Sequence, residues 1–162
     1  MKALTIYQPW ASLIAVCAKR FETRGWPTNY RGPIAIHAGV RSTTPFLRGL
    51  IRASEDYTLR NFALAYKETG LGMMEDLPRG SVIATAELVE CRQIRAHCGP
   101  FDESYNVLLD GFDVIDISHD EFLFGDWTPG RYAWELANVR PLPQPVPCKG
   151  RQGLWNWEGV AA

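Results

Sequence analysis

The stretch QPWASLIAVCAKRFETRGW, residues 8–26, changes halfway from the pattern of a helix to the pattern of a strand. After Pro9, apolar side chains recur at spacings of three and four, which predicts a short helix, and a proline suits the start of a helix. The polarity then alternates, which predicts a strand with one face formed by Glu22, Arg24 and Trp26. The stretch therefore predicts a helix followed directly by a strand, with charged side chains gathered between two tryptophans.

Further strands are expected on both sides of this stretch, because β-branched runs there are bounded by glycine and proline. Short strands are predicted at residues 3–7 and 32–39, longer ones at 78–94 and 130–142, and a proline-rich extended connection with a closing strand at 143–159. Helices are expected from Thr44 and Pro45, and from near Glu55 to Lys67. Strands outnumber helices, so the chain is predicted to be α+β, a small, mostly antiparallel β-barrel with covering helices, whose core includes Trp134, Trp155 and Trp157.

The length and composition are those of one globular unit. The chain has 162 residues, of which 46% are hydrophobic and 22% are charged, so a single domain over residues 1–162 is expected, without metal or disulfide support. The segment near 96–130 is acidic with little periodicity and is expected to be an irregular insertion.

The charge is distributed unevenly along the chain. The formal net charge is only -1, yet residues 1–60 hold nine Lys and Arg against three Asp and Glu, whereas residues 75–135 hold four against thirteen. The first third is therefore a candidate surface for an anionic partner. Alternatively, the two regions lie side by side and neutralise each other.

The sequence shows no sign of a membrane segment, a metal site or a cofactor motif. No apolar run approaches the length that spans a bilayer, and the N-terminus lacks the pattern of a signal peptide, so a cytoplasmic protein without membrane contact is expected. The four cysteines have no metal-ligand spacing and are expected to be reduced thiols. No metal or cofactor is expected.

Three charged side chains meet near the predicted helix end. Lys19 follows the end expected near Ala18, where a cation is favoured by about 0.3 to 1 kcal/mol, and Glu22 and Arg24 share a strand face. One interpretation is a surface ion-pair cluster, which contributes less than about 1 kcal/mol. Burial and neighbouring arginines would lower the pKa of Lys19, whereas Glu22 would raise it, and the sequence leaves this balance open.

The other interpretation is a site for RNA or a nucleotide. Aromatic faces stack on bases, Lys and Arg hold phosphates, and a carboxylate accepts hydrogen bonds from base amines. Two tryptophans flank the charged cluster, and more polar and aromatic residues follow it. The candidate ligand-binding residues are Gln8, Trp10, Lys19, Glu22, Arg24, Trp26, Tyr30, Arg31 and His37.

The segments LTIYQPWASLI, AKRFETRGW and YRGPIAIHA resemble the ASCH (activating-signal-cointegrator homology) domain family, whose signature combines a Q-P-W helix start with a G-x-K-x-x-E-x-R element. The later segments GSVIATAELVEC, YAWELANVRPL and KGRQGLWNW resemble its remaining strands. The resemblance implies a barrel related to the PUA fold, a class associated with RNA binding, and it places Lys19, Glu22 and Arg24 at signature positions. Cys17 stands where the family usually has glycine, which predicts either that no positive φ or close approach is needed there or that the helix continues one residue further.

Three functions follow as hypotheses. The first is RNA or nucleotide binding. The second is hydrolysis of an acylcytidine-type amide or of RNA phosphodiesters, with Lys19 as the proton-transfer or oxyanion-stabilising group, Glu22 as the base and Arg24 completing the catalytic set. In the amidase branch that the resemblance brings in, a threonine takes the position of Glu22, and here Thr23 is expected on the opposite strand face. The third is a protein-interaction module built on the acidic segment from Asp102 to Asp126.

Overall fold

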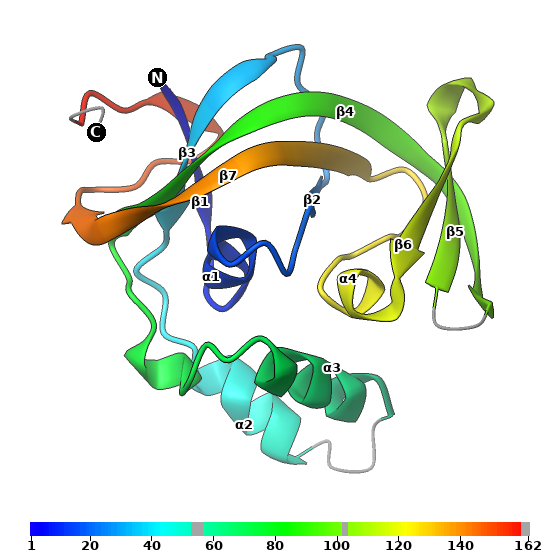
Figure 1. Cartoon of the computed structure of the whole chain (residues 1–162), viewed down its shortest axis with the longest axis horizontal. Coiled ribbons are helices and arrows are strands. Elements are labelled where there is room, and N and C mark those ends of the chain that lie inside the picture. Colours follow the sequence, from blue (N-terminus) through cyan, green and yellow to red (C-terminus); the bar gives the residue numbers. More distant parts are fainter. Residues whose placement is uncertain (53–56, 102–103, 160–162) are drawn as a thin grey trace.

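A curved sheet wraps around the first helix in the computed structural model, which describes residues 1–52, 57–101 and 104–159 (Figure 1). The strands are β1 (Lys2–Ile6), β2 (Phe21–Arg24), β3 (Gly32–Ala38), β4 (Ser81–Phe101), β5 (Ser104–Leu109), β6 (Val114–Ser118), β7 (Tyr132–Pro147) and β8 (Leu154–Asn156). The helices are α1 (Trp10–Ala15), α2 (Thr44–Arg52), α3 (Tyr57–Glu68) and α4 (His119–Leu123), with 3₁₀ turns η1 (Met74–Asp76) and η2 (Asp110–Phe112).

The main sheet has the strand order β2-β7-β4-β3-β1-β8, and β5 and β6 continue from β4. β1 and β3 are parallel, and the other pairs are antiparallel, so the prediction of an α+β fold with a mostly antiparallel sheet is confirmed. β2 and β8 remain at the two ends of this path. Among the described residues, the strands therefore do not close into a complete ring of hydrogen bonds.

The predicted irregular insertion is wrong for the described part of residues 96–130. β4 continues to Phe101 and pairs with β5, which pairs with β6, and α4 follows directly. The strands β5 and β6 are short and joined by η2, so each shows only two or three alternations and gives a weak sequence pattern. Residues 104–126, here named the acidic arm, form the hairpin and helix on one side of the molecule (Figure 1). Residues 102 and 103 lie outside the described residues.

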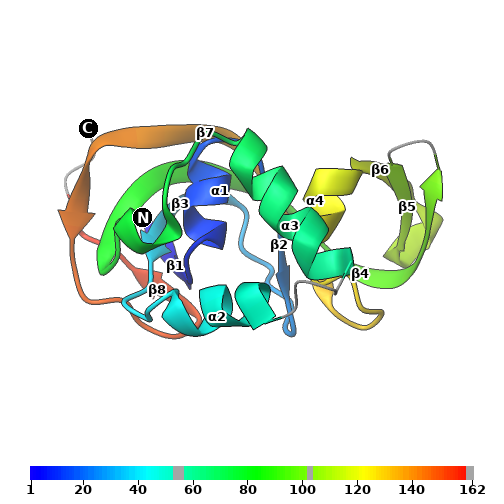
Figure 2. The same cartoon turned by 90° about the horizontal axis from the view of Figure 1, so that it is seen from below.

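Helix α1 packs between the sheet and the other helices. Its Ile14 belongs to the core inside the curved sheet, whereas Leu13 packs with Phe62 of α3 and Phe124 after α4. Figure 2 shows α3 between α1 and α4, and α2 on another side of α1. The predicted core tryptophans are confirmed as buried: Trp134, Trp155 and Trp157.

The helix ends differ in part from their predicted positions. α2 begins at Thr44 as predicted, and α3 is first described at Tyr57, since its expected start at Glu55 lies outside the described residues. α1 ends at Ala15 instead of near Ala18. Within the described residues, no helix has the length and apolar character needed to cross a membrane.

The prediction for Cys17 is wrong, because this residue has a φ of 61°. The N–H of Cys17 donates to Ile14 O at 2.9 Å, and the N–H of Ala18 donates to Leu13 O at 2.9 Å. These two bonds form a Schellman motif, whose residue after the C-cap adopts the left-handed conformation that favours glycine. Cys17 therefore takes the glycine conformation, at a cost of about 1 to 2 kcal/mol.

Candidate functional site

A cleft of about 510 Å³ lies where the two ends of the curved sheet face each other. One wall is the C-terminal end of β1, and the opposite wall is β2. Arg24 of β2 donates from Nη2 to the carbonyl oxygen of Thr5 in β1, at 2.9 Å. Other lining residues come from the start of α1 and from the loops next to β1, β2, β7 and β8, including Tyr7, Trp10, Trp26, Arg131, Arg151 and Gln152.

The predicted charged cluster of Lys19, Glu22 and Arg24 is brought together at this cleft. Glu22 Oε1 is 3.0 Å from Arg24 Nε, and Glu22 Oε2 is 3.8 Å from Lys19 Nζ. The three side chains do not face the same space, however. Arg24 lines the main cleft, Lys19 lines a second cavity of about 340 Å³, and Glu22 lines both.

Lys19 does not belong to a surface ion-pair cluster, because only 1% of it is exposed. Its Nζ donates to the carbonyl oxygen of Phe21 at 2.5 Å. Burial lowers the pKa of Lys19, and although Glu22 and Glu121 oppose this shift, the net direction is downward. The effect of burial on the pKa of Lys19 therefore exceeds the opposing effect of the carboxylates, which the sequence alone did not decide.

The acidic arm holds the backbone around Lys19. Glu121 of α4 accepts the N–H groups of Arg20, at 2.8 Å, and of Phe21, at 3.0 Å. Glu121 is itself buried, and Ser118 caps its helix by accepting the N–H of Glu121. The arm thus positions the turn between α1 and β2.

Both flanking tryptophans line the main cleft while packing on the core. Trp10 contacts Phe46 and Phe62 with ring centroids 5.1 and 6.2 Å apart. Trp26 makes an edge-to-face contact with Trp134 at 4.6 Å. Each ring is only partly buried, so part of its surface remains open toward the cleft.

Gln8 does not line either cavity, since its side chain is used inside the fold. Its amide nitrogen donates to Ser12 Oγ at 2.8 Å and to Pro78 O at 2.7 Å, and its amide oxygen accepts the N–H of Ser12. Gln8 therefore fixes the first turn of α1. Thr23 does line both cavities, but its hydroxyl accepts the N–H of Asp126 at 2.9 Å.

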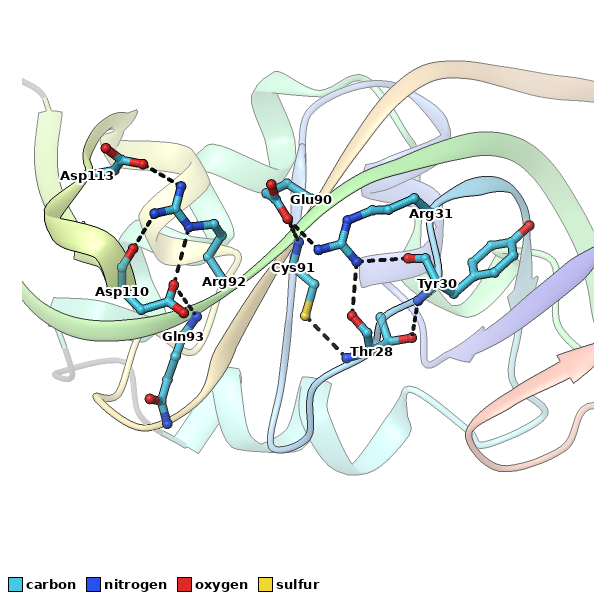
Figure 3. A network of polar contacts seen from close by, with 9 residues as sticks. All are labelled: Thr28, Tyr30, Arg31, Glu90, Cys91, Arg92, Gln93, Asp110 and Asp113. Carbon is cyan, nitrogen blue, oxygen red and sulfur yellow. Dashed lines mark hydrogen bonds and ion pairs between the residues drawn. The ribbon is translucent and has the colours of Figure 1, made fainter.

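Tyr30 and Arg31 lie in the loop before β3, in a different polar network that includes Glu90 and Cys91 of β4 (Figure 3). Arg31 forms an ion pair with Glu90 of β4 and donates to the carbonyl oxygen of Thr28 at 2.9 Å. Tyr30 donates its hydroxyl to Pro33 O at 2.6 Å. The N–H of Cys91 and the bond from Arg31 lower the pKa of Glu90. Neither residue is among those that line the main cleft.

His37 lies behind the cleft wall rather than in it. The residue is 1% exposed, its Nε2 lies 3.1 Å from Cys148 O, and its ring packs edge-to-face on Trp155. Burial lowers the pKa of His37 against the opposing effect of that carbonyl. In the pairing of β3 with β1, His37 lies opposite Thr5, and Thr5 does line the cleft.

The lining residues that the sequence interpretation missed include Tyr7, Arg131, Arg151 and Gln152. Tyr7 stood at the end of a predicted strand, and Arg131 stood at the start of another. The signal for the other two was the stretch KGRQG, in which glycines at 150 and 153 bracket two polar side chains. Over the residues that the structure describes, no group of three His, Cys, Asp or Glu side chains is placed to hold a metal ion.

Comparison with known proteins matches the ASCH domain to residues 4–145. The chain is 30% identical to human (Homo sapiens) activating signal cointegrator 1 and 24% identical to the mouse (Mus musculus) protein of that name, each over 153 residues. These alignments cover 94% of this chain but 22% of each relative, so the chain spans about a fifth of their length. The match over most of the sequence, including the Lys19, Glu22 and Arg24 positions, shows that the chain belongs to the ASCH domain family.

Proposed function

We propose that the protein binds single-stranded RNA or a nucleotide in the main cleft. The single observation that carries this proposal is the composition of the cleft lining, in which Tyr7, Trp10 and Trp26 stand among Arg24, Arg131 and Arg151. Aromatic rings offer stacking surfaces to any base, and arginines bind phosphate oxygens. A volume of about 510 Å³ lies in the range of small-ligand sites.

The cleft lining also carries a positive charge. Its three arginines face one carboxylate, Glu22, which already pairs with Arg24. A cleft lined mainly by one sign of charge raises the local concentration of the opposite sign. This supports an anionic ligand with a flat aromatic group, and it fits the PUA-like barrel that we propose for the curved sheet.

The test is a salt titration of single-stranded RNA binding, measured by fluorescence anisotropy. The affinity is expected to fall as the salt concentration rises, because phosphate contacts release counterions. Tyr7→Ala removes a half-exposed ring of the cleft and is expected to weaken binding about tenfold, the effect of one lost stacked base.

The matched control is Phe112→Ala, since Phe112 is an aromatic residue 91% exposed at the arm. It is expected to leave the affinity within about twofold, the scatter for a site that does not contact the ligand. Salt-independent binding, or equal losses in both variants, would contradict the proposal.

A second candidate function is amide hydrolysis of an acylated nucleoside. The observation that favours it is the pairing of Lys19, whose pKa is lowered by burial, with Glu22, which reaches both cavities. In this reaction Glu22 takes a proton from water, the hydroxide adds to the acyl carbon, and Lys19 stabilises the oxyanion. The C–N bond then breaks and the leaving amine takes the proton. The products are a carboxylic acid and the free nucleoside.

A panel of acylated nucleosides and short RNAs, analysed by mass spectrometry, tests this candidate. The expected product of the amidase is the free nucleoside, and cleaved RNA would indicate phosphodiester hydrolysis instead. Glu22→Gln keeps the side-chain shape and is expected to reduce turnover at least about 100-fold, the usual contribution of a general base. If no substrate of the panel is converted, the hydrolase candidate is contradicted and only the binding function remains.

A further inference from the structure

The three arginines of the main cleft differ in whether a carboxylate neutralises them. Arg24 pairs with Glu22 at 3.0 Å, and Arg131 pairs with Asp126 at 3.1 Å. Arg151 also lines the cleft, but within the described part of the chain its guanidinium has no ion-pair or hydrogen-bond partner. Within the described residues, Arg151 is therefore the lining cation that keeps all its guanidinium donors for a ligand, whereas Arg24 and Arg131 each use some of theirs inside the fold.

Lys19, one of the cations that the sequence pattern predicted to hold a phosphate, is not available in the same way. Its Nζ is buried and donates to the carbonyl oxygen of Phe21, and Glu22 lies 3.8 Å away. It also lines the second cavity instead of the main cleft. A phosphate in the main cleft would have to find its donors elsewhere.

The backbone that carries Arg151 is held firmly in place. Thr5 donates its hydroxyl to the carbonyl oxygen of Arg151 at 2.9 Å, and Trp155 donates from Nε1 to that same hydroxyl oxygen at 3.2 Å. A Cβ added at Gly150 would lie 2.4 Å from the His37 ring, so only glycine permits this close approach. The loop is thus anchored on the sheet while the Arg151 side chain stays exposed.

We propose that Arg151 binds a phosphate group of the ligand, and that the loop of residues 150–153 makes the cleft select nucleotides over uncharged nucleosides. The phosphate is either the 5′-phosphate of a mononucleotide or a backbone phosphate of single-stranded RNA. A guanidinium suits this task, because its planar donors match phosphate oxygens in pairs. In the same arrangement His37 is a positioning residue for the loop. This inference rests on the proposed function.

The experiment measures dissociation constants by isothermal titration calorimetry for the four nucleosides, their 5′-monophosphates and a ten-nucleotide single-stranded RNA. The wild-type protein is expected to bind monophosphates at least about tenfold more tightly than nucleosides, the effect of one charged hydrogen-bonded contact. Arg151→Ala should remove most of this preference, measured as the ratio of the nucleoside and monophosphate dissociation constants of the variant itself. It should also reduce the slope of log affinity for RNA against log salt concentration by about 1, the change expected for one lost phosphate contact.

The matched control is Lys149→Ala, which removes the same charge two residues away, at an exposed side chain that does not line the cleft. It should leave the phosphate preference unchanged, which separates a contact from a general field effect. Gly150→Ala keeps every charge but displaces the loop, and it should weaken phosphate binding about as much as Arg151→Ala. Thermal unfolding of this variant reports whether its fold persists.

The outcomes separate the two proposals. Tight monophosphate binding but weaker RNA binding would assign the phosphate to a free nucleotide, and the reverse would assign it to an RNA strand. Equal binding of nucleosides and monophosphates, unaffected by Arg151→Ala, would overturn the inference and leave the proposed function standing. Binding of none of these probes by the wild-type protein would overturn both.

Discussion

The main cleft and the acidic arm both gather charged side chains, but they use them differently. In the arm, Asp110 and Asp113 pair with Arg92 of β4, and Glu121 accepts two backbone N–H groups. In the cleft, cations outnumber carboxylates, and within the described residues the guanidinium of Arg151 has no ion-pair or hydrogen-bond partner. The charges of Asp110, Asp113 and Glu121 are thus satisfied within the fold, whereas those of the cleft leave donors for a ligand. A charge cluster in a sequence does not distinguish these two cases.

The largest expected effect comes from Glu22, the carboxylate between Lys19 and Arg24. Glu22→Gln leaves the buried Lys19 without its nearest counter-charge and is expected to reduce the free energy of unfolding by about 3 kcal/mol. Urea unfolding measures the change, with the exposed Glu87→Gln as its control. A loss below about 1 kcal/mol would mean that the cluster behaves like a solvated surface pair, as in the arm.

A smaller effect is expected from Glu121, which links the arm to the cleft. Glu121→Ala leaves the N–H groups of Arg20 and Phe21 without their acceptor, and a loss of about 2 kcal/mol in unfolding free energy is expected. Asp116→Ala, at an exposed residue of the same arm, should change stability by less than about 0.5 kcal/mol. Equal losses would show that the arm does not support the cleft through this side chain.

His37, behind the wall of the cleft, should also make the stability of the fold sensitive to acid. Burial lowers the pKa of His37 below its ordinary 6.5, so the unfolded chain binds more protons than the folded one as the pH falls below that value. The unfolding free energy should therefore decrease on acidification, by at most about 1.4 kcal/mol per pH unit from this residue. Unfolding curves between pH 5 and pH 8, chosen to bracket the ordinary pKa of about 6.5, should show this component lost in His37→Gln. They should show it retained in His97→Gln, at an exposed residue of β4.

The smallest effect is expected within the arm. Asp113→Asn breaks the pair with Arg92, but the carboxylate is 63% exposed and Arg92 keeps its contacts to Asp110. The expected loss of unfolding free energy is below about 0.5 kcal/mol. A Tm shift from differential scanning calorimetry checks it. A loss comparable to that of Glu22→Gln would remove the contrast between the arm and the cleft.

Much of the fold could be predicted from periodicity. The strand at 32–38, the start of the helix at Thr44 and the burial of Trp134 all follow from local patterns that the structure shares. The strands of the arm could not be found in this way, because each is too short to establish its own pattern. Cys17 was misjudged because the hydrogen bonds of the helix end force its φ whatever the side chain prefers.

The sequence by itself determined the family, the mostly antiparallel α+β fold and the closeness of Lys19, Glu22 and Arg24, since these depend on neighbours along one segment. Only the tertiary structure decided which charges face the cleft. The curved sheet brings Thr5, Arg24 and Arg151 to the same place from distant parts of the chain. Packing buries Lys19 and leaves Arg151 exposed, because the free energy of a charge depends on its surroundings in space.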